Sequence, residues 1–470
     1  MQSEYKNFLL NVVYQVLTFV FPLITVPYIS RVLGVENVGI YSYTYSIAYM
    51  FLLFGMLGLS NYGNREIAKV RDDRERTSER FSAIYSLQLI VNSIAILAYV
   101  SYVLFFCREF LLIAELQIIY VASILFDVSW FYFGLEKFKM TITRNLLIKV
   151  ISFVLIFMFV KERDDLWVYA LIMAMSTLLS QLYLFFNLRR FVYYRRPAVS
   201  QLRVHIKGVC LLFIPVLAYS IYRVMDKTMI GSLASVVELG YFDNAERLIN
   251  IPIMVNTALG TVMLPRMAYL LANSEAKFRE TILRSMQLAL MLACTMAFVL
   301  CLLANDISLV MFGPEFVKSG TIIRWLSVTI IVSAWANVIR TQYIIPCGLD
   351  SIYVKSTIGG AIINLCSNLI LIRLYGAIGA CVGTILAESY VMLYQSVMCR
   401  KQLNMGAYSR LLLKYCTHGI SIVLATWLIC FNIEPLPLRL TFEILIPIIM
   451  FFLLERKYIV YDFFGKAPKS

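Results

Sequence analysis

Hydrophobic and polar residues alternate along this chain in long blocks. Apolar stretches of about 20 residues, the length that crosses a ~30 Å hydrocarbon core as a helix, are separated by short polar loops. The alternation predicts fourteen membrane-spanning helices, with loops too short to hold a separate soluble domain. The expected ranges are 8–30, 38–60, 82–106, 112–134, 143–160, 166–187, 208–231, 243–264, 285–304, 322–346, 356–373, 377–398, 411–431 and 437–454.

Positive charge is concentrated in every second loop. The formal net charge is +14, although 60% of the residues are hydrophobic and the mean hydropathy is +0.77. An excess of Lys and Arg marks the cytoplasmic side, so both termini are expected inside and the number of spans is even. The basic segment 189–199 is therefore expected to face anionic lipid headgroups, and nucleic acid is not expected as a partner.

A faint internal repeat has an offset of about 201 residues. Gly34 and Gly39 precede the second span as Gly231 and Gly240 precede the eighth. Six spans separate equivalent points, which predicts an all-α membrane protein with two six-helix lobes related by a pseudo-two-fold axis along the membrane normal. The expected parts are 1–200 and 201–405 for the two lobes, and 406–470 for two additional helices and a cytoplasmic tail.

Several arginines lie inside the predicted spans. A charge at mid-span costs ~2.5–3.5 kcal/mol, so such a residue is expected to face the bundle interior or a wet cavity. Arg223 and Arg340 are the deepest, and Arg247 lies in the polar start of 243–264. A structural ion pair or an interfacial position is the alternative. Arginine stays charged and binds phosphate with two parallel hydrogen bonds, so these residues favour an anionic substrate.

Polar side chains also line one face of several spans. In 208–231 they follow the i, i+3, i+4, i+7 spacing of a single helix side. Such faces suit a central passage, and hydrogen bonding between helices is the competing explanation. Candidates for substrate contact are Asn11, Gln15, Tyr219, Tyr222, Asn364 and Asn368. Candidates for coupling to an ion are the acids Asp127, Asp226 and Glu388, with an interfacial ion pair as the alternative for Asp127.

The chain carries no motif of a catalytic or metal site. It contains no P-loop, HExxH or nucleophile elbow, its ten cysteines form no CxxC, and its two histidines lack metal-ligand spacing. We therefore expect no catalytic residues, no metal and no cofactor, and a transporter rather than an enzyme. Energy would come from an ion gradient, the membrane potential or the substrate gradient.

Five segments resemble the Wzx-type polysaccharide flippases of the multidrug/oligosaccharidyl-lipid/polysaccharide exporter superfamily. They are 27–46, 52–73, 127–145, 225–248 and 342–388, and the resemblance covers nearly the whole chain. It implies two lobes that alternate between inward- and outward-open states around a cationic cavity. It also implies an undecaprenyl-diphosphate-type oligosaccharide lipid as substrate, moved to the outer leaflet of a bacterial inner membrane for capsule, O-antigen or a similar surface polysaccharide.

The resemblance also implies roles for parts of the chain. The arginines would neutralise the diphosphate, the polar faces would contact sugars, and the isoprenoid tail would stay in lipid. Membrane lipids, a polysaccharide polymerase and a chain-length regulator are the other candidate partners. The last two helices exceed the family's usual twelve, and they would form a groove for the tail or simply pack.

Two other functions compete with this one. A cation-coupled multidrug or metabolite exporter of the same superfamily would be expected to have an acidic cavity, against which the arginines argue. An integral-membrane glycan polymerase would be expected to carry a substantial outer loop with catalytic residues, and the predicted outer loops are short.

Overall fold

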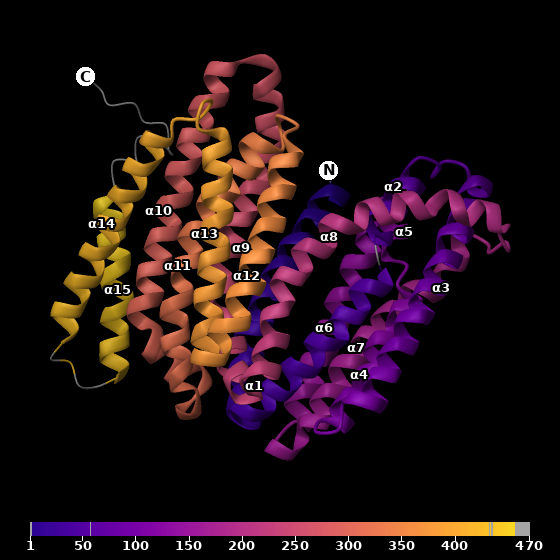
Figure 1. The fold of residues 1–470 in the computed structure, drawn as a ribbon, viewed down its shortest axis with the longest axis horizontal. Coiled ribbons are helices and arrows are strands. Elements are labelled where there is room, and N and C mark those ends of the chain that lie inside the picture. The colour runs from indigo at the N-terminus through magenta and orange to yellow at the C-terminus, as the bar shows by residue number, and fades with distance from the viewer. Residues whose placement is uncertain (1, 57, 432, 434–435, 456–470) are drawn as a thin grey trace. The chain divides into compact units, whose positions relative to one another are not determined.

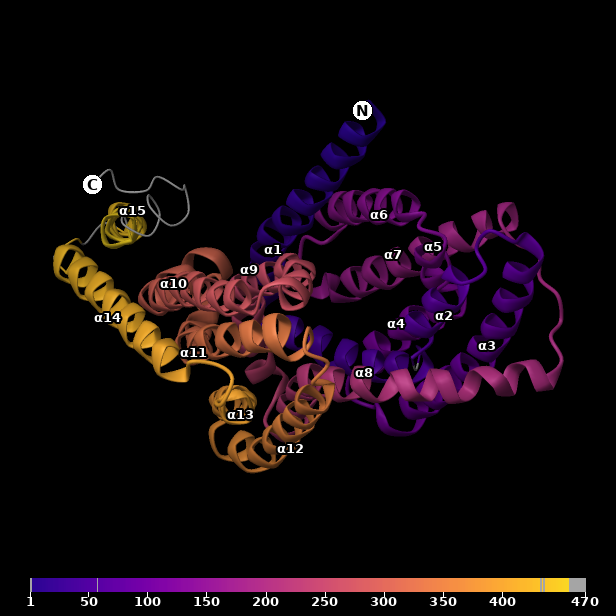
Figure 2. The same ribbon diagram turned by 90° about the horizontal axis from the view of Figure 1, so that it is seen from above.

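The protein is built from long α-helices, as the computed structural model in Figures 1 and 2 shows. The structure describes residues 2–56, 58–431, 433 and 436–455, without the side chains of 2–20, 211–212, 214–219, 221–223 and 436–437. This described part contains no β-strand. The chain forms two compact units, Met1–Gly240 (unit 1) and Tyr241–Ser470 (unit 2).

Unit 1 packs around its first helix. Helix α1 contacts α3, α4 and α8, helix α7 contacts α4 and α6, and the short helix α2 lies on α5. Helical backbone satisfies its own hydrogen bonds, which an apolar surrounding requires. The elements are α1 Gln2–Met56, α2 Leu59–Ala68, α3 Arg74–Phe106, α4 Leu111–Ala122, α5 Ser129–Gly134, α6 Phe138–Phe159, α7 Leu166–Asn187 and α8 Val199–Leu233, with 3₁₀ turns Ser123–Phe126, Arg163–Asp165 and Leu188–Arg190.

Unit 2 contains the remaining long helices. Helix α11 packs against α10 and α13, and α12 packs against α13. Helix α14 packs against α10 and α15. The elements are α9 Val236–Asn273, which begins in unit 1, α10 Glu275–Ile307, α11 Val317–Ile339, α12 Asp350–Tyr375, α13 Ala377–Cys399, α14 Met405–Cys430 and α15 Leu436–Leu454, with π-helical turns Ser308–Phe312 and Arg340–Ile344 and a 3₁₀ turn Pro314–Phe316.

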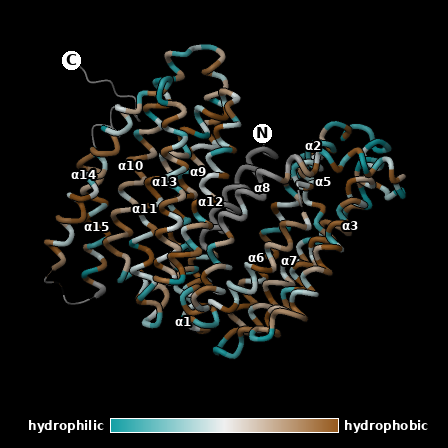
Figure 3. The backbone as a smooth tube through the Cα atoms, viewed as in Figure 1, coloured by the Kyte–Doolittle hydropathy of each residue, from teal (hydrophilic) through white to brown (hydrophobic). Residues whose placement is uncertain are grey.

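The predicted all-α membrane fold is confirmed. Each of the fourteen predicted spans overlaps one or more helices of the described residues, and eleven helices there are long and apolar enough to cross a membrane. The other three predicted spans lie in the first half of α1, in α8 and in α15. Figure 3 shows apolar residues along the helices and hydrophilic ones near many helix ends. Outward-facing Phe105 and Phe106 are 72% and 77% exposed, which suits contact with lipid.

The predicted loop between the first two spans is a single-residue kink. Gly34 interrupts α1 with φ 77° and ψ 173°, and helix continues on both sides. Only glycine adopts this conformation without a steric penalty, because it has no Cβ. The first two spans therefore join almost directly.

The predicted span 112–134 is split into α4 and α5 by the turn Ser123–Phe126. The buried amide of Gln88 donates to the carbonyl oxygens of Ile124 at 3.1 Å and Asp127 at 2.9 Å, and its Oε1 accepts from Trp130 Nε1 at 2.8 Å. Asn92 also donates to the Ile124 carbonyl, at 2.9 Å. Side chains of α3 thus replace backbone hydrogen bonds that the break removes.

Helix α1 and the start of α9 make a reciprocal contact within unit 1. A Cβ on Gly39 would lie 1.8 Å from the carbonyl oxygen of Val236, and one on Gly240 would lie 2.1 Å from that of Val35. The predicted repeat relates Gly39 to Gly240 and Val35 to Val236, so it exchanges one pair with the other. Reciprocal contacts of this kind arise when equivalent segments meet about a two-fold axis. The contact supports the repeat, while the division at residues 200 and 405 stays a prediction.

Candidate functional site

Arg340 lies where a membrane helix is interrupted. Helix α11 ends at Ile339, and the π-helical turn begins with Arg340. The half-buried guanidinium donates to Asn337 Oδ1 at 2.7 Å and lies 5.6 Å from the ring centroid of Tyr353. Within the described part of the chain, no carboxylate oxygen lies within 4.0 Å of its nitrogens. Its charge is partly removed from solvent without being neutralised, so it can accept an anion.

Polar residues of α9, of α11 and of the π-helical turn lie near this arginine through Asn337 or along the chain, and they were not among the predicted site residues. Asn337 Nδ2 donates to the carbonyl oxygen of Asn256 at 2.8 Å. Gly260 lets the helices approach, because a Cβ there would lie 2.7 Å from Asn337 Nδ2. Gln342 is fully buried, and its amide has no hydrogen-bond partner among the described residues. The i, i+3 spacing of Asn337 and Arg340 was the available signal.

Arg247 forms an ion pair inside α9. Its Nε lies 2.7 Å from Oδ2 of Asp243, four residues earlier. The side chain of Asp243 is 1% exposed and that of Arg247 is 41% exposed. A buried carboxylate is costly without a partner, so Arg247 also has a structural role. Its charge is less available to a substrate than that of Arg340.

Asn364 and Asn368 lie at the contact between α12 and α13. Both are fully buried, and Asn368 Nδ2 donates to Asn364 Oδ1 at 3.2 Å. A Cβ on Gly383 of α13 would lie 2.1 Å from Asn368 Oδ1, so the facing helix covers this side chain. The geometry matches the alternative of contact between helices, and a role in binding sugar stays a prediction.

The three acidic candidates lie in unlike surroundings. Asp127 follows the 3₁₀ turn Ser123–Phe126, and its Oδ1 accepts from the backbone N–H of Ser129 at 3.0 Å at the start of α5. Asp226 is buried in α8, and Glu388 is half-buried in α13. Asp127 therefore stabilises a turn, and coupling to an ion stays a prediction for all three.

The remaining candidates lie in α1 and α8. Their backbone is helical, but their side chains fall outside the described residues, so their roles stay predictions. They are Asn11, Gln15, Tyr219, Tyr222 and Arg223.

Arg144 of α6, at the start of the predicted span 143–160, is a buried arginine that was not among the predicted site residues. It is 6% exposed, and its Nη1 donates to Gln181 Oε1 at 3.0 Å and to the carbonyl oxygen of Ser180 at 3.3 Å. These bonds join α6 to α7. Its place near the polar end of a span gave no signal of burial.

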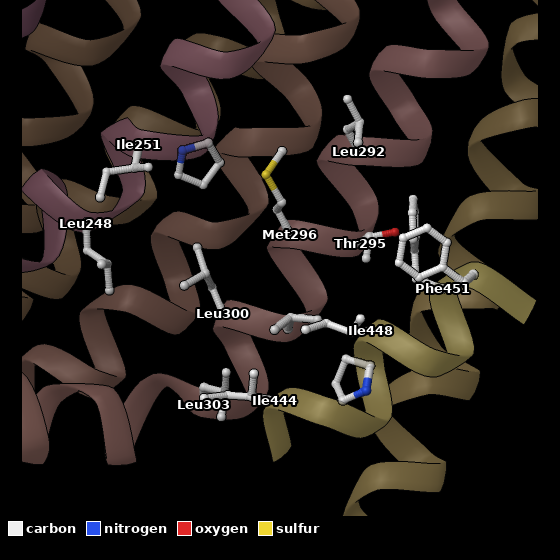
Figure 4. A pocket seen from close by; sticks show the side chains of 14 residues that line it. Leu248, Ile251, Leu292, Thr295, Met296, Leu300, Leu303, Ile444, Ile448 and Phe451 are labelled. Atoms are coloured by element: carbon white, nitrogen blue, oxygen red, sulfur yellow. The ribbon is translucent and has the colours of Figure 1, made fainter. Parts of the chain in front are cut away.

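Helices α9, α10 and α15 form an apolar groove of about 470 Å³ (Figure 4). Leu248 of α9, Leu300 of α10 and Ile448 of α15 contribute to its walls. The hydroxyl of Thr295 also lines the groove, but it donates to the carbonyl oxygen of Met291 at 2.8 Å. The groove therefore offers an apolar chain a surface with no free hydrogen-bonding group among these lining side chains.

An ion pair fastens α15 beside this groove. Arg439 pairs with Asp306 of α10, and its Nε lies 3.6 Å from Glu443 Oε1. Of the last two helices, α15 therefore helps to build the groove, which fits one of the two roles considered for them, and α14 supplies none of its lining residues.

Solved structures with this fold define the class of the protein. The lipid II flippase MurJ in an inward closed conformation aligns with a TM-score of 0.76 and 15% identity, over 95% of this chain and 100% of that one. An inward-facing multidrug resistance MATE family transporter of the MOP superfamily aligns with a TM-score of 0.64 and 15% identity, over 83% and 94%. The protein has the multispan helical fold that these membrane transporters share.

Sequence comparison identifies the family within this class. The profile described as "Polysaccharide biosynthesis protein" matches residues 5–271, more than half of the chain. The chain belongs to this polysaccharide biosynthesis protein family, as predicted. A putative O-antigen transporter of Escherichia coli (strain K12) is 20% identical over 391 residues, covering 82% of this chain and 94% of that protein.

Proposed function

We propose that this protein moves an isoprenoid-diphosphate-linked oligosaccharide from the inner to the outer leaflet of a bacterial inner membrane, for synthesis of a surface polysaccharide. Its family, its O-antigen transporter relative and its flippase fold support this function. The observation that carries the proposal is Arg340, a cation within a predicted span that has no carboxylate partner among the described residues. The protein acts as a transporter and catalyses no bond change.

Arg340 would bind the diphosphate. Asn337 and the ring of Tyr353 hold its guanidinium, and both are neutral, so the positive charge persists. Arginine can form two parallel hydrogen bonds to a phosphate, and these bonds are strong where water is scarce. Arg247 would add a weaker attraction, because Asp243 already balances its charge.

The groove of α9, α10 and α15 would hold the isoprenoid tail. Lipid chains are as apolar as the groove, so the hydrophobic effect alone gives a tail little preference for it. Binding would depend on shape and packing along the groove walls. The groove and Arg340 both belong to unit 2.

A flipping assay tests the role of Arg340. The protein is placed in vesicles with undecaprenyl diphosphate linked to a fluorescent disaccharide, and a membrane-impermeant quencher measures transfer between leaflets. Arg340→Gln should lower the rate about tenfold or more, because it removes a charge-assisted bond to phosphate worth ~1.5–3 kcal/mol. Arg340→Lys should recover part of the rate, since it keeps the charge but loses the paired hydrogen bonds.

Arg324→Gln is the matched control. Arg324 is exposed in α11, and its Nε has a 3.4 Å bond to the carbonyl oxygen of Cys301, so its replacement should leave the rate unchanged. Equal rates for Arg340→Gln and wild type would show that Arg340 does not bind the substrate. Export of cationic dyes without flipping would favour the multidrug exporter.

A further inference from the structure

Unit 1 contains a cavity of about 550 Å³ with charged side chains in its lining, and all of its lining residues except Ala83 lie outside the predicted spans. Arg76 and Arg80 of α3 line one wall, and Gln201 and His205 of α8 line another. Figure 3 shows that hydrophilic residues gather at the end of unit 1 where α2 lies. Two stretches of the chain more than 100 residues apart thus bring their basic and polar side chains to one cavity.

The two arginines of this cavity keep most of their hydrogen-bond donors unused. The nearest carboxylate to Arg80 is Glu66, at 3.9 Å, and Lys69 already holds that carboxylate at 2.7 Å. Arg76 reaches Asp73 through Nε at 3.4 Å. A guanidinium has five N–H donors, so both arginines retain donors for a ligand. Positions 76 and 80 are one turn apart, so they share a face of α3.

Residues of α8 supply further donors. His205 is 3% exposed, and its Nδ1 is hydrogen-bonded to the hydroxyl of Tyr62 at 2.7 Å. Gln201 Oε1 accepts from the backbone N–H of Ala198 at 2.8 Å. Among the described residues, His205 Nε2 and the Gln201 NH₂ group have no hydrogen-bond partner. Each can donate a hydrogen bond to an anionic oxygen.

One acidic side chain also lines the cavity. Glu79 Oε1 lies 3.8 Å from Nη1 of Arg195, and its side chain is 52% exposed. Arg195, which does not line the cavity, partly balances the negative charge of Glu79. The positive charge of Arg76 and Arg80 therefore exceeds the negative charge at the cavity.

We propose that this cavity binds a phosphate group at the cytoplasmic surface of the membrane, with Arg76 and Arg80 as the charged contacts and Gln201 and His205 as further donors. The positive-inside rule puts the basic segments that form the cavity on the cytoplasmic side, beside anionic headgroups. The phosphate would be that of an anionic phospholipid or free inorganic phosphate. The site uses residues of unit 1 alone, and it does not depend on the proposed function.

A bound phosphate would connect two helices. Arg80 belongs to α3 and His205 to α8, and both elements contact α2 as well. Gly208 already fits closely on Tyr62, where a Cβ would lie 2.2 Å from the ring. The ligand would therefore add a charged link where α8 enters the membrane.

The test measures binding to the full chain with two probes. Inorganic phosphate is titrated in detergent, and phosphatidylglycerol is titrated in nanodiscs of phosphatidylcholine. The double variant Arg76→Gln/Arg80→Gln should bind the probe that wild type binds about tenfold more weakly or worse. Binding of phosphatidylglycerol but not of phosphate supports a lipid ligand, and the reverse supports free phosphate.

Two further variants distinguish a loss of the binding site from a loss of folding. Val204 lines the cavity and is 69% exposed, so Val204→Trp should block the cavity at little cost to folding. Arg284→Gln is the matched control, because Arg284 is exposed and pairs with Glu280 in unit 2. The proposal is overturned if neither probe binds, or if binding is the same in wild type, the double variant and Val204→Trp.

Discussion

At the scale of single residues, Gln88 shows how one buried amide can support a backbone irregularity. Its three hydrogen bonds reach the carbonyl oxygen of Ile124 within the 3₁₀ turn, that of Asp127 just after it, and the indole of Trp130. In an apolar surrounding, lipid tails offer no hydrogen-bonding groups and water is scarce, so these carbonyl groups would lose their partners without Gln88. The break between α4 and α5 therefore depends on a residue about 40 positions earlier in the chain.

Replacing Gln88 by Leu should destabilise the protein by about 2–3 kcal/mol, because buried partners lose their hydrogen bonds. The measurement is the free energy of unfolding in mixed micelles. Gln402→Leu, at an exposed position, is the control and should change stability by less than about 0.5 kcal/mol. Equal stabilities for both variants would contradict the role assigned to Gln88.

His205 should make stability depend on pH. Burial lowers its pKa below the usual 6.5, the positive charge of Arg80 lowers it further, and Glu66 opposes the shift. The unfolded chain then binds a proton at a higher pH than the folded protein does. This contribution to stability is complete above pH 6.5 and is lost as the pH falls toward the folded pKa.

Melting temperatures between pH 7.5 and 5 check this sign. Wild type should lose stability on acidification more steeply than His205→Gln, because glutamine at position 205 does not titrate. The other charged neighbours, Glu66 and Arg80, are present in both proteins. Parallel curves would show that the His205 ring does not contribute.

At the scale of residues, the clearest signal in the sequence was a charge that contradicted the apolar pattern. Arg340 stood out because an arginine inside a span is costly, and the structure shows it without a carboxylate partner in the described part. Gln342 was missed because a neutral amide in an apolar span gives no comparable signal. For Asn364 and Asn368, helical spacing showed a shared face but could not show that α13 covers it.

At the scale of helices, the length of apolar segments was the strongest signal. A stretch that spans the membrane must be helical, so all fourteen ranges were found. The break in 112–134 was missed because it lies in apolar sequence and depends on distant side chains of α3. Local patterns do not contain such long-range contacts.

The ion pair between Arg439 and Asp306 should anchor α15 to α10. Arg439→Gln should lower stability by about 1–3 kcal/mol, because it leaves a partly buried carboxylate without this partner. Exchange of the two charges, Arg439→Asp with Asp306→Arg, should restore part of the loss. Thermal unfolding of wild type, Arg439→Gln, the single variants Arg439→Asp and Asp306→Arg, and the double variant measures this. A double variant whose loss equals the sum of the two single losses would exclude the anchor.

At the scale of the whole molecule, the charge of the loops predicts that both ends of the chain lie in the cytoplasm. A green fluorescent protein fused to the C-terminus should fluoresce, whereas alkaline phosphatase fused there should be inactive. Fusions in the segment 305–321, an expected outer loop, should give the opposite pattern. An active phosphatase at the C-terminus would contradict the predicted cytoplasmic location of that end.

The crossing of α1 and α9 makes Gly39 and Gly240 two halves of one constraint. A side chain added at either position would push apart the same pair of backbones, so losing both glycines should harm the protein little more than losing one. If the repeat arose by tandem duplication of an ancestral gene, each copy has been selected for close packing against the other copy. The two glycines would then be expected to covary among homologues as if they were a single site.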